Sequence, residues 1–541
     1  MTIRNSSLVL LITIMGTVAC VQKSNVSSDA FMGEITVCGT VQFSDGCGDE
    51  VDKTIAYGLA LIHHMTYEEA GNIFTKVTEE NEDCFWGLWG KGLSYIHPLW
   101  NDPPSEEKLT EGWNLAQQAL KLAKNEKEIG YAKALAAYYE NGPQKTEKER
   151  LKNYHDAWKI AFESNVADLE AKTFYALSLI AISDPADKTF ANQLKAGKLS
   201  EEVLQVINDH PGAFHYIIHA YDYPGLSDKA LAVANMYGKI APQIPHALHM
   251  PTHIFTRLGM WKESIDWNKR SAEAAFQKTV DGSISMHYFH ALDYLVYAYM
   301  QTAEDNKARM ILEDLKKLEG SFQMHPATAY SLAATQSRFL LERQDWKNAS
   351  ALTLPGNVDF WNKFPEYEAL THFAVGLGAA RNGSPVSAKK ALERLNQLQS
   401  LIKIPYWSGQ VEIQKNIINA WLALGRGSKK EAVALMTLAS DQEWATQKHP
   451  ITPGELLPAR ELFGDLLLSL NQSKEALEQY EMTLQRSPGR MNSLYGAARS
   501  AELSGDQQKA KLYYQQLMDL TSGAERSLEK TQKAAEFLKN T

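Results

Sequence analysis

The spacing of apolar residues predicts helices along nearly the whole chain. From Asp52 onward, apolar positions recur three and four residues apart, in segments of roughly ten to eighteen residues. Gly, Pro, Asp and Asn, which favour helix ends and turns, separate these segments. No stretch shows the strict alternation of apolar and polar residues that is typical of a half-buried strand. The pattern therefore predicts an all-α protein.

An internal repeat predicts how these helices pack. Gly58 is followed twelve residues later by Ala70, and Phe74 comes four residues after that. Small residues let two antiparallel helices approach closely, and a bulky residue fills the gap to the next helix pair. The same triplet recurs as Gly376/Ala388/Leu392, Ala420/Ala432/Met436, Gly464/Ala476/Tyr480 and Ala498/Ala510/Tyr514. Glycines with left-handed backbone are expected at the turns between paired helices, namely Gly383, Gly427 and Gly505.

Two of these spacings resemble the tetratricopeptide repeat. Gly58 and Gly92 are 34 residues apart, as are Gly464 and Ala498, and this is the length of that repeat. The segment ELFGDLLLSLNQSKEALEQYEMTLQRSPGR also matches its motif. The resemblance covers most of residues 51–520, with insertions, and implies a solenoid of helix pairs wound into a right-handed superhelix. Such an array binds its ligands on its concave face.

The first residues predict export and a lipid anchor. Residues 1–19 combine Arg4, an apolar run over residues 8–15 and the small residue Ala19, as in a signal peptide. The segment resembles a bacterial lipoprotein signal, which implies that Cys20 is lipidated in the cell envelope; an ordinary secretory signal is the alternative. Two further segments, HYIIHAYD and PHALHMPTHIFTRLG, are similar to a family of exported bacterial tetratricopeptide proteins for which no activity is established.

The mature chain is predicted to have three parts. Residues 20–50 hold the anchor and an irregular tether rich in Ser, Gly and Asp. Residues 51–320 form an N-terminal array that carries a histidine cluster, and residues 321–541 form a C-terminal array with a polar cap helix. No later stretch is apolar over the roughly eighteen residues that a membrane helix needs, so we expect attachment through acyl chains alone.

Cysteine usage agrees with export. Cys38 and Cys47 bracket a short loop that contains glycine, and they can form a local disulfide in an oxidising compartment. Cys84 has no obvious partner and is expected to be a small buried residue.

The charge balance argues against nucleic acid as a partner. The formal net charge is -9, and the chain has no basic run. The expected partners are instead a peptide, a protein or a small ligand in the concave groove.

Histidines spaced by one helical turn predict a shared site. Eight of the fifteen histidines lie within residues 210–293. His215 and His219 are one turn apart, and His249 and His253 repeat this pair 34 residues later. A further shift of 44 residues leads from the second helix to a third set of side chains at matching depth, His290, Asp293 and Tyr297. If the three helices stack side by side, these side chains converge.

The cluster has the composition of a metal site. Imidazole is a common ligand for zinc, copper and iron, and two histidines one turn apart supply two ligands to one ion. The candidate ligands are His215, His219, Asp222, His249, His253, His290 and Asp293. The alternative is that these side chains are hydrogen-bonded and pack the seams between repeats. Pro251 either kinks the helix between His249 and His253 or begins a new helix, which would make the convergence less secure.

Other side chains are candidates for the ligand groove. His246, Arg257 and Tyr297 belong to the same helices as the cluster, and Arg257 either binds an anion or forms a salt bridge. Trp86 and Trp89, three residues apart, either form an aromatic floor for a ligand or belong to the core.

Two histidines outside the cluster, His63 and His64, are expected to form a solvated or capping pair at a helix end. His210 and His287 are expected to be capping or packing residues.

Two functions of different classes fit these features. The first is an exported, lipid-anchored binding protein with zinc, copper or iron at its histidine cluster. The second is a metal-dependent enzyme, a hydrolase or oxidoreductase, in which the metal activates water or oxygen and Asp222 or Asp293 acts as ligand or general base. The chain has no HExxH motif, no phosphate-binding glycine loop and no GxSxG motif. Four protein ligands on an ion favour a structural role, whereas three and an open position favour catalysis.

Overall fold

Helices follow one another along the part of the chain that the computed structural model describes, which is residues 38–43, 47–100, 102–184, 186–318, 320–356, 358–524 and 528–541. The predicted signal peptide, the predicted lipidation site Cys20 and most of the predicted tether lie outside the described residues. From Val37 to Thr541 the chain forms one unit by its internal contacts. The predicted boundary at residue 320 stays a prediction.

The first half of this unit contains the following helices: α2 (Asp49–His63), α3 (Tyr67–Glu80), α4 (Phe85–Leu93), α5 (Glu106–Leu122), α6 (Glu126–Tyr139), η1 (Gly142–Gln144), α7 (Glu147–Ser164), α8 (Leu169–Ala181), α9 (Ala191–Leu204), α10 (Pro211–Tyr221), η2 (Ser227–Ala230), α11 (Leu231–Ile240), α12 (Pro245–His249), α13 (Pro251–Arg257) and α14 (Trp261–Gln277). The second half contains α15 (Met286–Gln301), α16 (Asp305–Lys317), α17 (Pro326–Glu342), α18 (Trp346–Ala349), α19 (Val358–Trp361), α20 (Pro365–Arg381), α21 (Pro385–Leu401), α22 (Pro405–Gly425), α23 (Lys429–Ala445), α24 (Ala459–Ser469), α25 (Ser473–Arg486), α26 (Met491–Ser504), α27 (Gln507–Leu520) and α28 (Glu529–Lys539).

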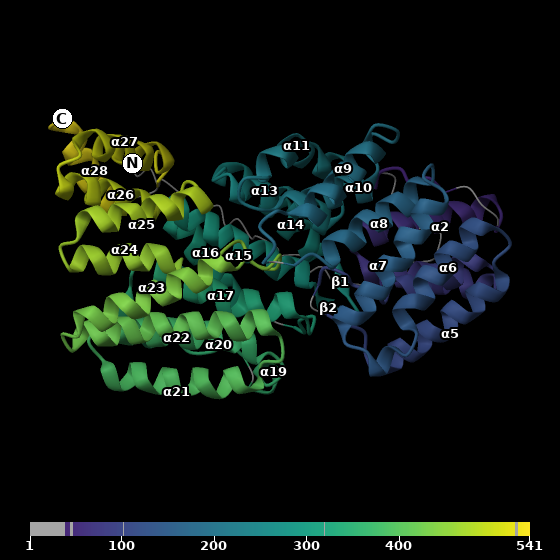
Figure 1. Cartoon of the computed structure of the whole chain (residues 1–541), viewed down its shortest axis with the longest axis horizontal. Helices are drawn as coiled ribbons and strands as arrows, with labels where there is room; N and C mark the ends of the chain where they lie inside the picture. The colour runs from purple at the N-terminus through teal and green to yellow at the C-terminus, as the bar shows by residue number, and fades with distance from the viewer. Residues whose placement is uncertain are drawn as a thin grey trace, which may run out of the picture. The chain divides into compact units, whose positions relative to one another are not determined.

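Consecutive helices pack against each other as pairs. The pairs α20 with α21, α22 with α23, α24 with α25 and α26 with α27 each share an extensive contact, and each pair also contacts the next (Figure 1). The predicted fold class, an all-α array of tetratricopeptide-like helix pairs, is confirmed. A short hairpin of β1 (Thr279–Val280) and β2 (Ser283–Ile284), which the helical pattern did not predict, joins α14 to α15.

The repeat triplet packs as predicted. A Cβ atom added at Gly464 would lie 2.6 Å from the Tyr480 ring, and one added at Gly496 would lie 2.3 Å from it. Only glycine lets both helices approach this ring so closely. The turn glycines Gly427 and Gly505 have φ angles of 84° and 85°, in the left-handed region. The small and bulky positions of the repeat therefore set the distance between helices, and its glycines set the turns.

Two large hydrophobic cores lie along the chain, one formed by residues between Ile55 and Phe255 and the other by residues between Met286 and Phe537. A smaller cluster between Trp261 and Ala308 lies between them in sequence. Helix α15 contacts α12 and α14 of the first half and α17 and α26 of the second. The histidine-rich helices α10, α12, α13 and α15 thus lie where the two cores meet.

The disulfide differs from the predicted one. Cys47 is bonded to Cys84, while Cys38 is free, so the predicted Cys38–Cys47 pair is wrong. Phe43 packs edge-on against Trp86 of α4, with ring centroids 4.9 Å apart, and Cys84 is the N-cap of the same helix. The sequence spacing favoured a local loop, but the tertiary contact brings a more distant cysteine closer.

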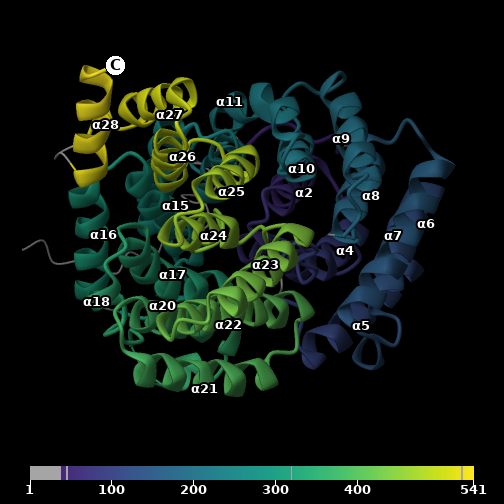
Figure 2. The ribbon, with the colours of Figure 1, turned by 60° about the vertical axis from the view of Figure 1, so that its left-hand side comes forward.

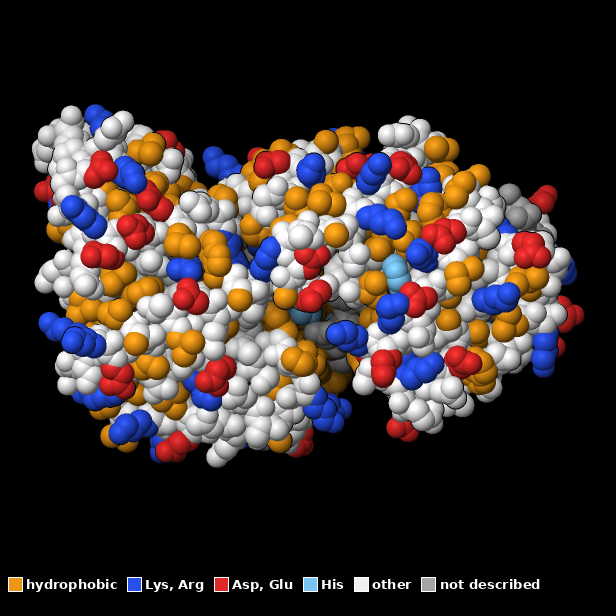
Figure 3. Space-filling view, viewed as in Figure 1, with side chains coloured by type: hydrophobic (Ala, Val, Ile, Leu, Met, Phe, Trp, Pro, Cys, Tyr) orange, Lys and Arg blue, Asp and Glu red, His pale blue; other side chains and the backbone are white. Residues whose placement is uncertain are grey.

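The surface carries charges of both signs. On the face in Figure 3, Lys and Arg side chains are interspersed with Asp and Glu, and neither sign forms a continuous patch. Among the described residues, no helix has both the length and the apolar character needed to cross a membrane.

Candidate metal centre

Four helices bring six histidines together in the interior. Helix α10 carries His215 and His219, α12 carries His246 and His249, α13 carries His253, and α15 carries His290. Helix α10 lies beside α2 (Figure 2) and also contacts α13, while α12 contacts α15. We call these side chains the six-histidine centre. They are at most 8% exposed, so the predicted convergence occurs in a buried site and not on an open groove surface.

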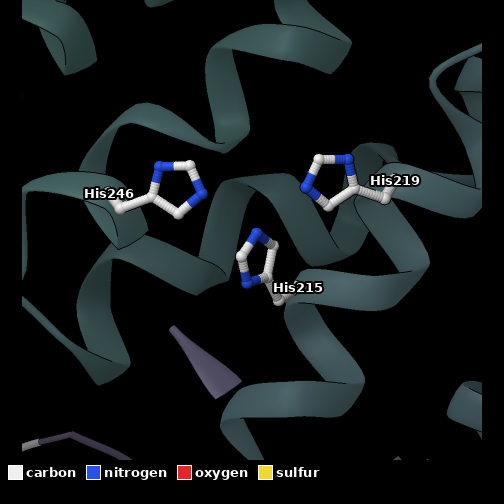
Figure 4. A group of neighbouring side chains, drawn as sticks. All are labelled: His215, His219 and His246. Atoms are coloured by element: carbon white, nitrogen blue, oxygen red, sulfur yellow. The ribbon is translucent and has the colours of Figure 1, made fainter. Parts of the chain in front are cut away.

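Three of these histidines, His215, His219 and His246, form the first triad. Their ligand-type nitrogens lie within 4.8 Å of one another, and each ring points one nitrogen toward the space between them (Figure 4). His215 Nδ1 donates a hydrogen bond of 2.6 Å to the carbonyl oxygen of His63. The lone pair of this imidazole is therefore on Nε2. Within the described residues, no hydrogen-bond partner is present for Nε2 of His215, Nε2 of His219 or either nitrogen of His246.

The second triad consists of His249, His253 and His290, whose ligand-type nitrogens also lie within 4.8 Å of one another. His249 Nδ1 is 2.7 Å from Oδ1 of Asn268, and His253 Nδ1 is 2.9 Å from Oδ2 of Asp222. Both oxygens are acceptors, so both Nδ1 atoms carry the proton. The two Nε2 atoms then face each other at 3.1 Å with a lone pair on each.

The junction between α12 and α13 at Pro251 does not disrupt this geometry. Helix α12 ends at His249 and α13 begins at Pro251, so of the two alternatives at this proline the structure has the new helix. Met250 between them keeps helical angles, with φ -53° and ψ -39°. His249 and His253 consequently stay one turn apart across the junction.

Burial makes the six imidazoles neutral ligands. Loss of solvation lowers the pKa of every histidine in the centre, and it lowers that of His219 to about 3. A neutral imidazole has a free lone pair, which is the form that binds metal. At neutral pH the centre therefore presents six uncharged nitrogen donors.

Asp222 is an outer partner of the centre and not a member of either triad. Its Oδ1 accepts from Nε of Arg257 at 2.8 Å, and its Oδ2 accepts from Nζ of Lys448 at 2.6 Å and from His253. Burial opposes ionisation, but the two cations hold the pKa of this carboxyl well below its usual range. Carboxylates commonly orient a metal-bound histidine in this way. Arg257, predicted for anion binding or a salt bridge, forms the salt bridge.

Neither Asp293, predicted as a metal ligand, nor Tyr297, predicted for the groove, is a member of either triad. Oδ1 of Asp293 accepts from Nε of Arg338 at 3.2 Å. The Tyr297 hydroxyl accepts from Nη1 of Arg490 at 2.9 Å. Asp293 is less than a full turn from His290 on α15, so its side chain points to a neighbouring face of the helix that packs on α17.

Trp86 and Trp89, expected to form either an aromatic floor for a ligand or part of the core, belong to the core. Trp86 is 2% exposed and Trp89 is 1% exposed, and both rings contact Tyr131 at centroid distances of 5.4 and 5.3 Å. A separate surface cleft of about 530 Å³ is lined by residues such as Tyr67 and Lys108. None of the residues predicted for the groove lines this cleft.

A second group of buried histidines surrounds Glu170. His63 Nε2 donates to Oε2 of Glu170 at 2.8 Å, and His210 Nε2 donates to Oε1 at 3.0 Å. Tyr216 lies 3.0 Å from His63 Nδ1, and His210 Nδ1 caps α10 by accepting from Ala213. We call His63, Glu170, His210 and Tyr216 the Glu170 cluster. Of the two roles expected for His63 and His64, solvated or capping, the solvated one is wrong because both side chains are buried. His210, expected to cap or to pack, caps α10.

Several residues of the site were missed from the sequence. Asn268 and Lys448 are polar residues without a motif, and neither is near a histidine pair in sequence. A cavity of about 20 Å³ adjoins both triads; Trp100 and Ile451 line it together with His219, His246, His253 and His290. The Trp100 ring lies 5.2 Å from that of His246. Trp100 lies in the stretch PLWNDPP, and Lys448 and Ile451 lie in the stretch ATQKHPITPG. The prolines of these two stretches were the only sequence signal for the three residues.

Comparison with known proteins adds little to this description. No family model matches the chain. No curated protein matches it either. A structure of the human IFIT1 dimer with m7Gppp-AAAA aligns with 88% of this chain and 96% of that chain at 13% identity, with a TM-score of 0.37. Yeast Tom70 aligns with 91% of this chain and 95% of that chain at 12% identity, with a TM-score of 0.33. These scores are too low to transfer a function, and the expectation of no nucleic-acid partner stays a prediction.

Proposed function

We propose that this chain is an exported metal-binding protein, in which a tetratricopeptide-like array holds one transition-metal ion in each triad of the six-histidine centre. Zinc, copper and iron are the candidate metals, since imidazole suits all three. The proposal extends the sequence prediction by dividing the ligands into two sets of three and by removing both carboxylates from the ligand set.

One observation carries the proposal, which is the pair of Nε2 atoms of His249 and His253 at 3.1 Å. If His249 Nε2 carried the proton of a neutral ring, Nδ1 would become an acceptor facing the Asn268 oxygen at 2.7 Å. A doubly protonated His249 or His253 would also put a proton between the two nitrogens, but burial lowers the pKa of both side chains. A cation between the two nitrogens satisfies both lone pairs.

The partners of the other ring nitrogens support a metal site. Metal-bound histidines usually donate their second N–H to a carbonyl or carboxylate oxygen. His215 donates to a backbone carbonyl, His249 to an amide oxygen and His253 to a carboxylate. These three bonds fix the rings in the tautomer that directs Nε2 to the interior of the centre.

Export and lipid attachment remain part of the proposal. The signal-like residues 1–19 and the cysteine at position 20 support it. The Cys47–Cys84 disulfide also supports it, because disulfides persist in oxidising compartments. The surface cleft near Tyr67 offers a place for a peptide, protein or small ligand.

A metal-dependent enzyme is the second candidate function. Three protein ligands leave an open position on an ion, as in catalytic zinc sites. The cavity beside both triads would lie next to such a position. Asp222, occupied by two cations, does not fit the role of general base that the sequence suggested.

The test measures metal bound by the chain from residue 21 onward. After incubation with zinc, copper or iron salts and removal of excess metal, we expect two ions per folded chain by elemental analysis. The double variant His215→Ala, His249→Ala removes one ligand from each triad and is expected to bind none stoichiometrically.

The matched control is the double variant His97→Ala, His372→Ala, which removes two histidines outside the centre and should still bind two ions. Circular dichroism establishes that each variant is folded. A folded parent chain that binds none of the three metals would overturn the proposal.

A further inference from the structure

The six-histidine centre differs from most two-metal sites in having no anionic ligand. Neither triad contains a carboxylate or a thiolate. The nearby Asp222 is paired with both Arg257 and Lys448, and Asp293 is paired with Arg338. These two carboxylates and three cationic side chains together carry a net positive charge. They therefore do not offset the charge of a bound ion.

The two triads also adjoin each other closely. The His246 ring lies 4.9 Å from that of His215 in its own triad and 6.1 Å from that of His249 in the other. The His219 and His253 rings are 5.8 Å apart across the boundary. Two divalent ions at such a site repel each other about four times as strongly as two monovalent ions at the same distance. Burial weakens solvent screening, so the difference in repulsion energy between divalent and monovalent ions is large at this site.

These two features select among the metals that imidazole binds. Zinc and iron enter proteins as divalent ions, whereas copper also occurs as a monovalent ion, and imidazole is a suitable ligand for copper. Three neutral nitrogen donors around copper(I) add no charge and leave one position open. The neutral ligand set and the short separation together favour copper(I) in both triads.

The cavity limits what can occupy the open positions. Its volume of about 20 Å³ is enough for one water-sized molecule, since a cavity needs roughly 10–15 Å³ to hold a water. Histidines of both triads line it, and Leu99, Pro326 and Ile451 add apolar walls. No Asp, Glu, Lys or Arg of the described residues lines it. A small neutral molecule of two heavy atoms fits this space, whereas an organic substrate does not.

We infer that the six-histidine centre is a paired copper(I) site that binds dioxygen in the adjoining cavity, a conclusion that rests on the proposed metal-binding function. Each copper(I) gives one electron to dioxygen, which becomes a peroxide dianion held between two copper(II) ions. No proton or external reductant is needed for this step. The dianion also offsets the extra charge of the oxidised ions in a site that has no anionic ligand.

The first experiment loads the chain from residue 21 onward with copper(I) without oxygen and then measures dioxygen uptake with an oxygen electrode. We expect two copper ions per chain and one dioxygen per two copper ions. The same chain loaded with zinc is expected to take up none. In competition at equal free concentration, copper(I) is expected to displace zinc.

The second experiment fills the cavity without changing a ligand. Ile451→Phe adds a larger apolar side chain to the cavity wall, so we expect it to keep two copper ions and to lose at least tenfold in dioxygen affinity. Ile451→Leu, which conserves volume, should bind dioxygen like the parent.

Each alternative outcome has a distinct meaning. Copper binding without dioxygen uptake, or displacement of copper(I) by zinc, overturns the inference and leaves the metal-binding function intact. Undiminished dioxygen uptake by a folded Ile451→Phe chain overturns the assignment of the cavity. Failure of the chain to bind any of copper, zinc and iron overturns both the inference and the proposed function.

Discussion

Two groups of buried histidines lie within this array, and they differ in where the carboxylate is placed. In the Glu170 cluster, the carboxylate lies between two imidazoles and accepts from both, and Gln42 N donates to it at 2.9 Å. In the six-histidine centre, the carboxylate of Asp222 lies outside the triads and binds Nδ1 of one ring. The first arrangement uses the ring nitrogens for hydrogen bonds, and the second leaves nitrogens directed at one another.

The difference teaches how a fold can make histidine either a structural residue or a ligand. A buried polar group is stable when its hydrogen bonds are satisfied, and the Glu170 cluster meets this condition with protein groups alone. The six-histidine centre does not, because five of its nitrogens have no partner among the described residues, namely Nε2 of His215, Nε2 of His219, both nitrogens of His246 and Nδ1 of His290. Both groups are buried, with no side chain more than 8% exposed, so the number of unsatisfied nitrogens distinguishes them.

The largest effect is expected from breaking the Glu170 cluster. Glu170→Gln keeps the shape but removes the charge and places an amide N–H against a histidine N–H. Loss of a buried charged partner typically costs about 3–5 kcal/mol of unfolding free energy, and urea denaturation would measure it. Metal content should stay at two ions per folded chain. The control Glu536→Gln, at an exposed site on α28, should change stability little. Loss of metal from a folded Glu170→Gln chain would mean that this cluster, too, is a metal site.

A smaller effect is expected from removing an outer partner of the six-histidine centre. Asn268→Ala takes away the oxygen that orients His249. Outer partners of metal-bound histidines typically contribute about 10- to 100-fold in affinity, so metal affinity measured by competition with a chelator should fall by at least tenfold. Asn235→Ala, on the exposed face of α11, is the matched control. An unchanged affinity in Asn268→Ala would indicate that the His249 tautomer does not depend on this bond.

The smallest effect per residue is expected from pH in the metal-free chain. Burial lowers the pKa of His219 to about 3, while an unfolded histidine titrates near 6.5. Between these values the unfolded state binds one proton more, so stability rises with pH across this window and is lost as the pH falls. The slope is about 1.4 kcal/mol per pH unit for each such histidine. His219→Gln should reduce the slope by about that amount in urea denaturation between pH 5.5 and 4. An identical slope in the variant would show that His219 is protonated in the folded chain.

Much of the fold could be predicted because its signals are local. Helices follow from apolar spacing, and the Gly464 and Tyr480 positions identify a helix pair within sixteen residues. The convergence of His215 with His219, and of His249 with His253, was also predictable because one helical turn relates the members of each pair. Stacking of neighbouring repeats then brings the pairs together.

The rest of the site depends on contacts between distant segments. Lys448 reaches Asp222 across 226 positions, and the His63 carbonyl reaches His215 across 152. Neither contact leaves a periodic trace in the sequence. The predicted role of Asp293 failed for a related reason: the spacing placed it near His290, but Arg338 on another helix determines where its carboxylate points. Cys84 likewise pairs through a tertiary contact.

The lysine that reaches Asp222 also bears on when the centre can mature. All six ligands are encoded between residues 215 and 290, but Lys448 comes much later, so a growing chain exposes its imidazoles long before their outer carboxylate is neutralised. If the chain crosses the membrane unfolded, its metal is taken up only after translocation. The ion supply of the destination compartment, and not that of the cytoplasm, would then decide which element the finished protein carries.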